Sequence, residues 1–186
     1  MRIVVEIRDA SLQAFAARLE QLAAGRGRAL LAQSLNQAGK GIRHQSVPAE
    51  AAQTGLPVGT IERAQQTIEA TASSLSFTIL AKGGNVRLKF FGPQESGQGV
   101  VAHPWNKSTF YHRAFTMGGR PGSRVPLRFG GEVKMRAGSS RLPLKTVRSG
   151  LFIPDEMLSG RTGATLNSAS DALVVPILLS RLGSLL

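Results

Sequence analysis

Few side chains in this 186-residue chain have the types and spacing that catalysis or metal binding requires. The three histidines, His44, His103 and His112, lie far apart and lack Cys, Asp or Glu neighbours at metal-site spacing. The absence of cysteine excludes disulfides and thiolate chemistry. Asp155 and Glu156 are adjacent, so on a helix they face different directions and helix capping explains them better than acid–base chemistry. We therefore expect no enzyme, no metal and no cofactor.

A glycine-rich segment invites comparison with a phosphate-binding loop. Residues 118–122 read GGRPG, but the Gly-Lys-Ser/Thr ending that would place a lysine and a hydroxyl at the phosphates is missing. The segment 93–99 fails the same test. No Gly-x-Ser-x-Gly nucleophile elbow occurs either. Both segments are therefore interpreted as turns.

Positive charge is the strongest functional signal in the sequence. The chain has 23 Lys and Arg against 11 Asp and Glu, a net charge of +12. Between Lys82 and Arg148 there are 13 basic residues and only Glu95 and Glu132, so this segment carries +11 and the rest +1. Such a surface favours phosphate backbones or an acidic protein partner, without base specificity. A solvated cationic face is the alternative explanation.

The most regular pattern lies between residues 130 and 157. Polar and apolar residues alternate on either side of a small-residue turn at 137–140, which predicts a hairpin, and a Pro-led acidic helix start follows. We expect the basic side chains of this hairpin to form a surface that faces DNA or a partner: Lys134, Arg136, Arg141 and Lys145.

Residues 92–131 break every periodic pattern with glycine and proline, yet they contain large aromatic side chains. An irregular loop of this length is uncommon inside a compact monomer. We therefore predict an extended arm at about 92–131 that neighbouring subunits order, with these aromatic residues at the contact: Trp105, Phe110, Tyr111 and Phe115.

The remaining elements are predicted from periodicity. A strand is expected at 3–7, a helix from Asp9 or Ser11 to about residue 23, and a second helix from Arg28 that Pro48 stops or kinks. A third helix after Pro57 is expected to reach residue 68. Strands at 75–80 and 86–91 are expected to pair as a hairpin through the glycine turn at 82–85.

A last helix is predicted from Thr162 or Asn167 to Leu182, kinked at Pro176, with an inner face at positions 166, 169, 173, 177 and 185. The apolar run before Leu182 is shorter than the about 20 residues of a membrane span, so no membrane protein is expected. The predicted class is α+β in one unit, residues 1–186: N-terminal helices, a small antiparallel sheet with a long loop arm, and a C-terminal helix.

With these elements in order, the chain resembles the minor tail protein Z family of long-tailed bacteriophages, a tail-completion family of the head–tail joint. The resemblance covers residues 28 to 185. It rests on the helical stretches 29–45 and 56–70, the strand pair 74–92, and the segment 132–157, which contains RLP at 141–143 and GLFIP at 150–154.

This resemblance implies a structural virion protein of the tail or neck, assembled in the host cytoplasm. It implies a homo-oligomer, a hexameric ring, that joins the head connector to the tail terminator or tube, with packaged double-stranded DNA reaching its lumen. A long arm lying across a neighbour fits a head-to-tail ring. The alternative is a stand-alone protein that binds nucleic acid without sequence specificity. The helix after Pro57 contains only Arg63, where relatives can be densely basic.

Overall fold

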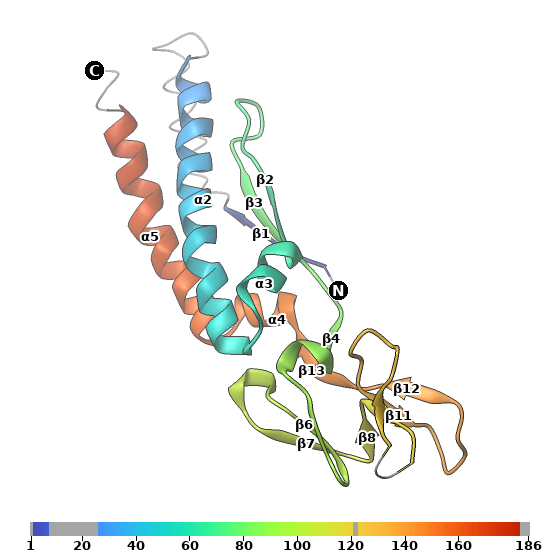
Figure 1. Cartoon of the computed structure of the whole chain (residues 1–186). Helices are drawn as coiled ribbons and strands as arrows, with labels where there is room; N and C mark the ends of the chain where they lie inside the picture. Colours follow the sequence, from blue (N-terminus) through green and yellow to red (C-terminus); the bar gives the residue numbers. More distant parts are fainter. Residues whose placement is uncertain (1, 8–25, 121–122, 183–186) are drawn as a thin grey trace.

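The computed structural model describes residues 2–7, 26–120 and 123–182, and it confirms the α+β class. Two long helices, α2 (Arg26–Thr54) and α5 (Gly160–Leu182), lie side by side, and α2 separates α5 from a three-stranded sheet (Figure 1). Further short strands gather at the opposite end of the molecule. The expected helix after Asp9 and the position Leu185 fall outside the described residues.

Helix α2 is the central element of the fold. Its buried side chains recur at the predicted three- and four-residue spacing: Leu31, Leu35, Ala38 and Ile42. The helix passes Pro48 and ends only at Thr54, so the prediction that Pro48 stops it is wrong. A proline removes one helical hydrogen bond. Val47 and Ala51 are buried on either side of it, and their packing holds the last turns.

The sheet under α2 has the strand order β1-β3-β2 and is antiparallel throughout. Its strands are β1 (Arg2–Ile7), β2 (Gln65–Ile68) and β3 (Phe77–Lys82). β3 is the central strand, and its first five residues are buried. The N-terminal strand is confirmed by its backbone pairing with β3.

Two local predictions around this sheet are wrong. The helix after Pro57, α3 (Val58–Ala64), ends four residues early, and β2 follows it at once. The expected hairpin through residues 82–85 does not form, because β1 and β2 occupy both edges of β3. Strand β4 (Asn85–Arg87) pairs instead with β13 (Arg148–Phe152), and residues 88–91 form a 3-10 helix.

Helix α4 (Ile153–Leu158) leads into α5, which begins at residue 160 and continues through Pro176. The predicted inner face of α5 is confirmed for Leu166 and Ala169, which are buried, and for residues 173 and 177, which are partly buried. Together with buried residues of α2 and β3 they form one hydrophobic core, here called the upper core.

Residues 92–147, here called the β-extension, are more regular than the predicted arm. They contain a sheet ordered β5-β6-β7, a sheet ordered β12-β11-β8 and the pair β9–β10. The strands have two to four residues each, too short for a visible alternation between glycines and prolines. Their bounds are Gln94–Ser96, Gly99–Ala102, Thr109–His112, Ala114–Phe115, Met117–Gly118, Val125–Pro126, Lys134–Arg136 and Leu144–Thr146.

A second core joins the β-extension to the lower end of α2. Val47 and Leu56 from the helical part are buried together with Val100, Val133 and Leu151. The predicted hairpin at 130–146 is confirmed by the pairing of β11 with β12. The two cores therefore share α2, one at each end of the helix.

A polar junction at the last turn of α2 ties these parts together. Gln53 Nε2 donates to Glu156 Oε2 at 2.7 Å, and Gln53 Oε1 accepts from the backbone N–H of Thr162 at 2.9 Å. Trp105 Nε1 donates to the other oxygen of Glu156 at 2.8 Å. Asp155 and Glu156 do lie in the first turn of α4, but Glu156 binds these two side chains and makes no cap.

A buried carboxyl group lies beside this junction. Glu50 is fully buried and accepts a hydrogen bond of 2.7 Å from Gln65 Nε2, while its Oε1 has no hydrogen-bond partner among the described residues. Burial raises the pKa of Glu50 to about 7; the bond from Gln65 opposes this shift and the negative charge of Glu156 adds to it.

Replacing Gly39 by alanine should destabilise the fold, because the added methyl group would overlap the ring of Phe77 where α2 crosses β3. Overpacking of this kind lowers the free energy of unfolding by about 3 kcal/mol where the surrounding atoms cannot move. Gly59→Ala is the control, since no atom lies within 4 Å of a methyl group there and the site is in helix α3. Urea unfolding followed by circular dichroism measures both. Equal stability of the two variants would contradict the close approach of α2 to the sheet.

Glu50 makes the stability of the protein depend on pH. The folded state holds its proton to a higher pH than the unfolded state, so stability should fall between about pH 4.5 and about pH 7 and then level off. Glu50→Gln should remove this fall and be more stable than the parent above pH 7, by up to about 3 kcal/mol. Unfolding free energies at several pH values measure the effect. The exposed Glu62→Gln is the control, and an unchanged profile for Glu50→Gln would exclude Glu50 as the source.

Candidate functional site

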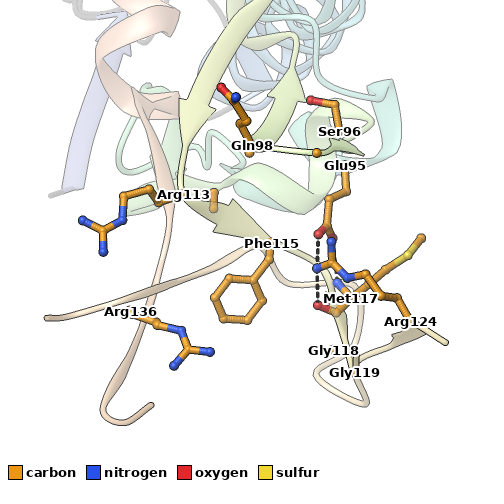
Figure 2. Close-up of a pocket in the computed structure, with 13 residues that line it drawn as sticks. Glu95, Ser96, Gln98, Arg113, Phe115, Met117, Gly118, Gly119, Arg124 and Arg136 are labelled. Atoms are coloured by element: carbon orange, nitrogen blue, oxygen red, sulfur yellow. Dashed lines mark hydrogen bonds and ion pairs between the residues drawn. The ribbon is translucent and has the colours of Figure 1, made fainter. Parts of the chain in front are cut away.

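Both acidic side chains of the β-extension are used inside it. Glu95 Oε2 accepts hydrogen bonds from the backbone N–H groups of Thr116 and Met117 at 2.7 and 2.8 Å, and Glu95 pairs with Arg124. Figure 2 shows Arg124 reaching Glu95 and the Met117 carbonyl together. Burial opposes ionisation, but these donors and Arg124 outweigh it and lower the pKa of Glu95. Glu95 therefore acts in its ionised form, and its carboxylate holds the turn after β8.

Glu132 plays the same part at the base of the central hairpin. Lys134 Nζ donates to Glu132 Oε2 at 2.6 Å and to Thr146 Oγ1 at 2.7 Å, and Arg87 pairs with Oε1. The hydrogen bond from Lys134 is the main cause of the lowered pKa of Glu132. Lys134 also lies 5.3 Å from the ring centre of Phe129. Lys134, predicted as part of the charged surface, is thus a mostly buried structural residue.

The other predicted basic residues do reach the surface. Arg136, Arg141 and Lys145 are exposed, and their side chains make no hydrogen bond or ion pair to another described residue. Other exposed basic side chains of the β-extension are Lys107, Arg113, Arg120 and Arg128. With Glu95 and Glu132 engaged internally, the outer surface is left almost purely cationic.

An apolar groove lies between these cations. It has a volume of about 510 Å³, and Arg136 and Arg141 are among its lining residues. Its apolar lining comes from β8, β10, β12 and the loops around them: Phe115, Val125, Leu127, Phe129, Leu142 and Leu144. The sequence analysis missed this groove, although Val125, Phe129 and Leu142 stand among Gly, Pro and Arg, where no local core explains them. Water-exposed apolar grooves of this kind mark binding surfaces.

The four aromatic residues predicted for an intersubunit arm have different environments. Trp105 and Tyr111 are half-buried and pack against the second core of their own chain, the one that joins the β-extension to α2. Contacts within one chain therefore order this part of the segment. Phe115 lines the groove. Phe110 is 48% exposed on β7, so of the four it presents the most open side chain to a partner.

Among the described residues, no three His, Asp or Glu side chains come together as a metal site, and no helix is long and apolar enough to cross a bilayer. His44 lies in α2, His103 precedes the turn at 104–106, and His112 ends β7. The GGR part of the glycine-rich segment forms the end of β9 and the turn after it. Arg113, Arg136 and Phe115 line the hollow in front of that turn, as Figure 2 shows. This arrangement can contact a ligand or partner through positive charge and through apolar surface.

The two kinds of basic residue in the hairpin should respond differently to neutralisation. Lys134→Gln should lower the melting temperature by a few degrees, because it removes the charged partner of Glu132 inside the hairpin. Replacing Arg136, Arg141 and Lys145 by Gln together should leave the melting temperature nearly unchanged, since exposed charges without partners contribute little. Differential scanning calorimetry compares the two proteins. A larger decrease in the triple variant would show that its side chains hold the fold.

Comparison with known proteins adds no relative to these observations. No protein-family model, no curated protein and no solved structure matches the chain. The resemblance to the minor tail protein Z family therefore stays a hypothesis that rests on the order of the elements and on the segments 29–45, 56–70, 74–92 and 132–157. The structure separates the two parts of that pattern: residues 141–143 lie at the exposed tip of the hairpin, while Leu151, Ile153 and Pro154 are buried at the entry to α4.

Proposed function

We propose that this chain is a non-enzymatic structural protein of a tailed-phage virion, a tail-completion or neck component. In this function it forms a ring, hexameric by the family resemblance, that joins the tail to the head connector. The β-extension presents its cations to the packaged DNA end or to an acidic neighbour such as the connector, the tail terminator or the tube.

The observation that carries this proposal is the outer surface of the β-extension. Arg136 and Arg141 stand next to the exposed apolar lining of the groove, and the acids that could neutralise them, Glu95 and Glu132, are bound elsewhere. A surface that is both cationic and apolar is disfavoured in a free monomer and favoured at an interface with an acidic partner. An assembly protein needs such surfaces for contact with its neighbours.

A second candidate function, stand-alone binding of nucleic acid, is favoured by the exposed cations alone. It predicts binding of free duplex DNA that weakens steeply with salt, and no self-association. The exposed apolar groove argues against it, because phosphate backbones offer no apolar surface to fill such a groove. The two functions therefore differ in whether the protein assembles.

The test is electron microscopy of lysates from a phage in which this gene is deleted, with the protein supplied from a plasmid. Without the protein we expect filled heads and finished tails that remain separate, or joined particles that do not infect. The parent protein should restore infectivity. Normal infectious particles without the protein would refute the virion function.

The same complementation tests the cationic surface. The variant with Arg136, Arg141 and Lys145 replaced by Gln should restore infectious particles poorly, at least about tenfold below the parent if these three charges together contribute about 1.4 kcal/mol or more to partner binding. The control removes the same amount of charge from exposed positions outside the β-extension: Arg63, Lys82 and Arg161 to Gln. Equal infectivity of the two variants would show that the β-extension cations are not used.

A further inference from the structure

The four most exposed large apolar side chains among the described residues fall into two patches. Leu142 and Val125, 68% and 61% exposed, belong to the groove of the β-extension. Leu179 and Val175, 64% and 56% exposed, lie on the outer face of α5. Figure 1 shows α5 and the β11–β12 hairpin at opposite ends of the molecule. One copy therefore cannot bring its own two patches together.

The patch on α5 is a stripe along one side of the helix. Asp171, Val175 and Leu179 are four residues apart, a spacing that places their side chains in one row. The row faces away from the core, because the residues of α5 that pack in the core with α2 are those at 166, 169, 173, 174, 177 and 178. Asp171 is exposed and is the only acidic residue of α5. These three residues are here called the α5 stripe.

The groove and the stripe are complementary in shape and charge. The groove is concave, has a mainly apolar lining and includes Arg136 and Arg141 in that lining. The stripe is convex, with two aliphatic side chains one turn apart and a carboxylate one turn before them. Seating Val175 and Leu179 in the groove would bring Asp171 toward those guanidinium groups. Charges arranged in this way fix the orientation of an interface.

We propose that the α5 stripe of one copy docks in the groove of the next copy, so that the chain assembles head to tail. The two surfaces differ, so the contact is heterologous, and its repetition generates a closed ring or an open fibre. The inference deepens the proposed function: it rests on the self-association that this function requires and assigns the surfaces that produce it. It also gives an occupant to a groove that a lone copy leaves open to water.

Two variants that each remove one half of the contact test the proposal. The groove variant carries Val125→Asp and Leu142→Asp. The new carboxylates would repel Asp171 of the copy that docks in the groove. The stripe variant carries Val175→Asp and Leu179→Asp. All four positions are exposed, so both proteins should fold, and circular dichroism melting checks this. The control carries Ile68→Asp and Leu158→Asp, two exposed apolar positions outside both patches.

Native mass spectrometry of the purified proteins gives the outcome. The parent and the control should form the same oligomer, and each patch variant should be monomeric. Mixing the two patch variants should give a one-to-one dimer and nothing larger, because only one intact groove and one intact stripe then meet. This result would establish a head-to-tail contact, since a symmetric contact between like patches would leave one variant fully assembled.

Three outcomes would overturn the proposal. They are a monomeric parent protein at its highest soluble concentration, parent-like assembly of either patch variant, and a mixture of the two variants that remains monomeric. Failure here is distinct from failure of the proposed function. If the oligomer survives in both variants and the gene deletion still separates heads from tails, the ring is built through other surfaces. If assembly follows the proposal but deletion leaves normal phage, the neck function fails alone.

Discussion

The hydrogen-bonded end of α2 is the constraint on which the rest of the structure depends. Gln53 reaches both Glu156 in α4 and the start of α5, and Glu156 reaches back to Trp105 in the β-extension. Asn106 adds a bond of 2.8 Å to the carbonyl oxygen of Ala52. Three segments far apart in the sequence, 52–53, 105–106 and 156–162, thus meet within one helical turn. The helical layer and the β-extension can hold one relative orientation because these bonds are directional, which apolar contacts are not.

This junction is kept at a thermodynamic cost. Glu50 is buried beside Glu156, and its oxygen Oε1, like Arg43 Nε and Gln65 Oε1, has no hydrogen-bond partner among the described residues. A buried polar group without a partner is destabilising by about 1–3 kcal/mol. Apolar replacements would pack there without that cost. The polar groups are consistent with a requirement for one arrangement of α2 against β2, since Gln65 Nε2 donates the hydrogen bond that Glu50 Oε2 accepts.

The sequence was sufficient where periodicity is long and local. Leu31, Leu35, Ala38 and Ile42 repeat over several turns, and they predicted α2 and its buried face. The sequence was insufficient where pairing partners are distant. Val58, Ile61 and Ile68 continue one helical spacing, so the stretch of β2 was predicted as helix. Only its pairing with β3 makes this stretch a strand. The charged surface was partly predicted. Arg136 and Arg141 are exposed as expected, but Lys134 is not, because its bond to Glu132 depends on Thr146 across the hairpin.

Charge sets the condition under which the proposed ring can close. Every copy carries a net charge of +12, so neighbouring copies repel, and one contact between Asp171 and the groove arginines cannot offset this. The apolar surface of the groove must supply the attraction, which added salt does not weaken, while salt screens the repulsion. Salt should therefore strengthen contacts between copies and weaken contacts to a polyanion. A polyanion such as DNA that lies along the cationic surface removes the repulsion without removing the apolar contact. Closure of the ring and engagement of an anionic partner are then thermodynamically linked, each favouring the other.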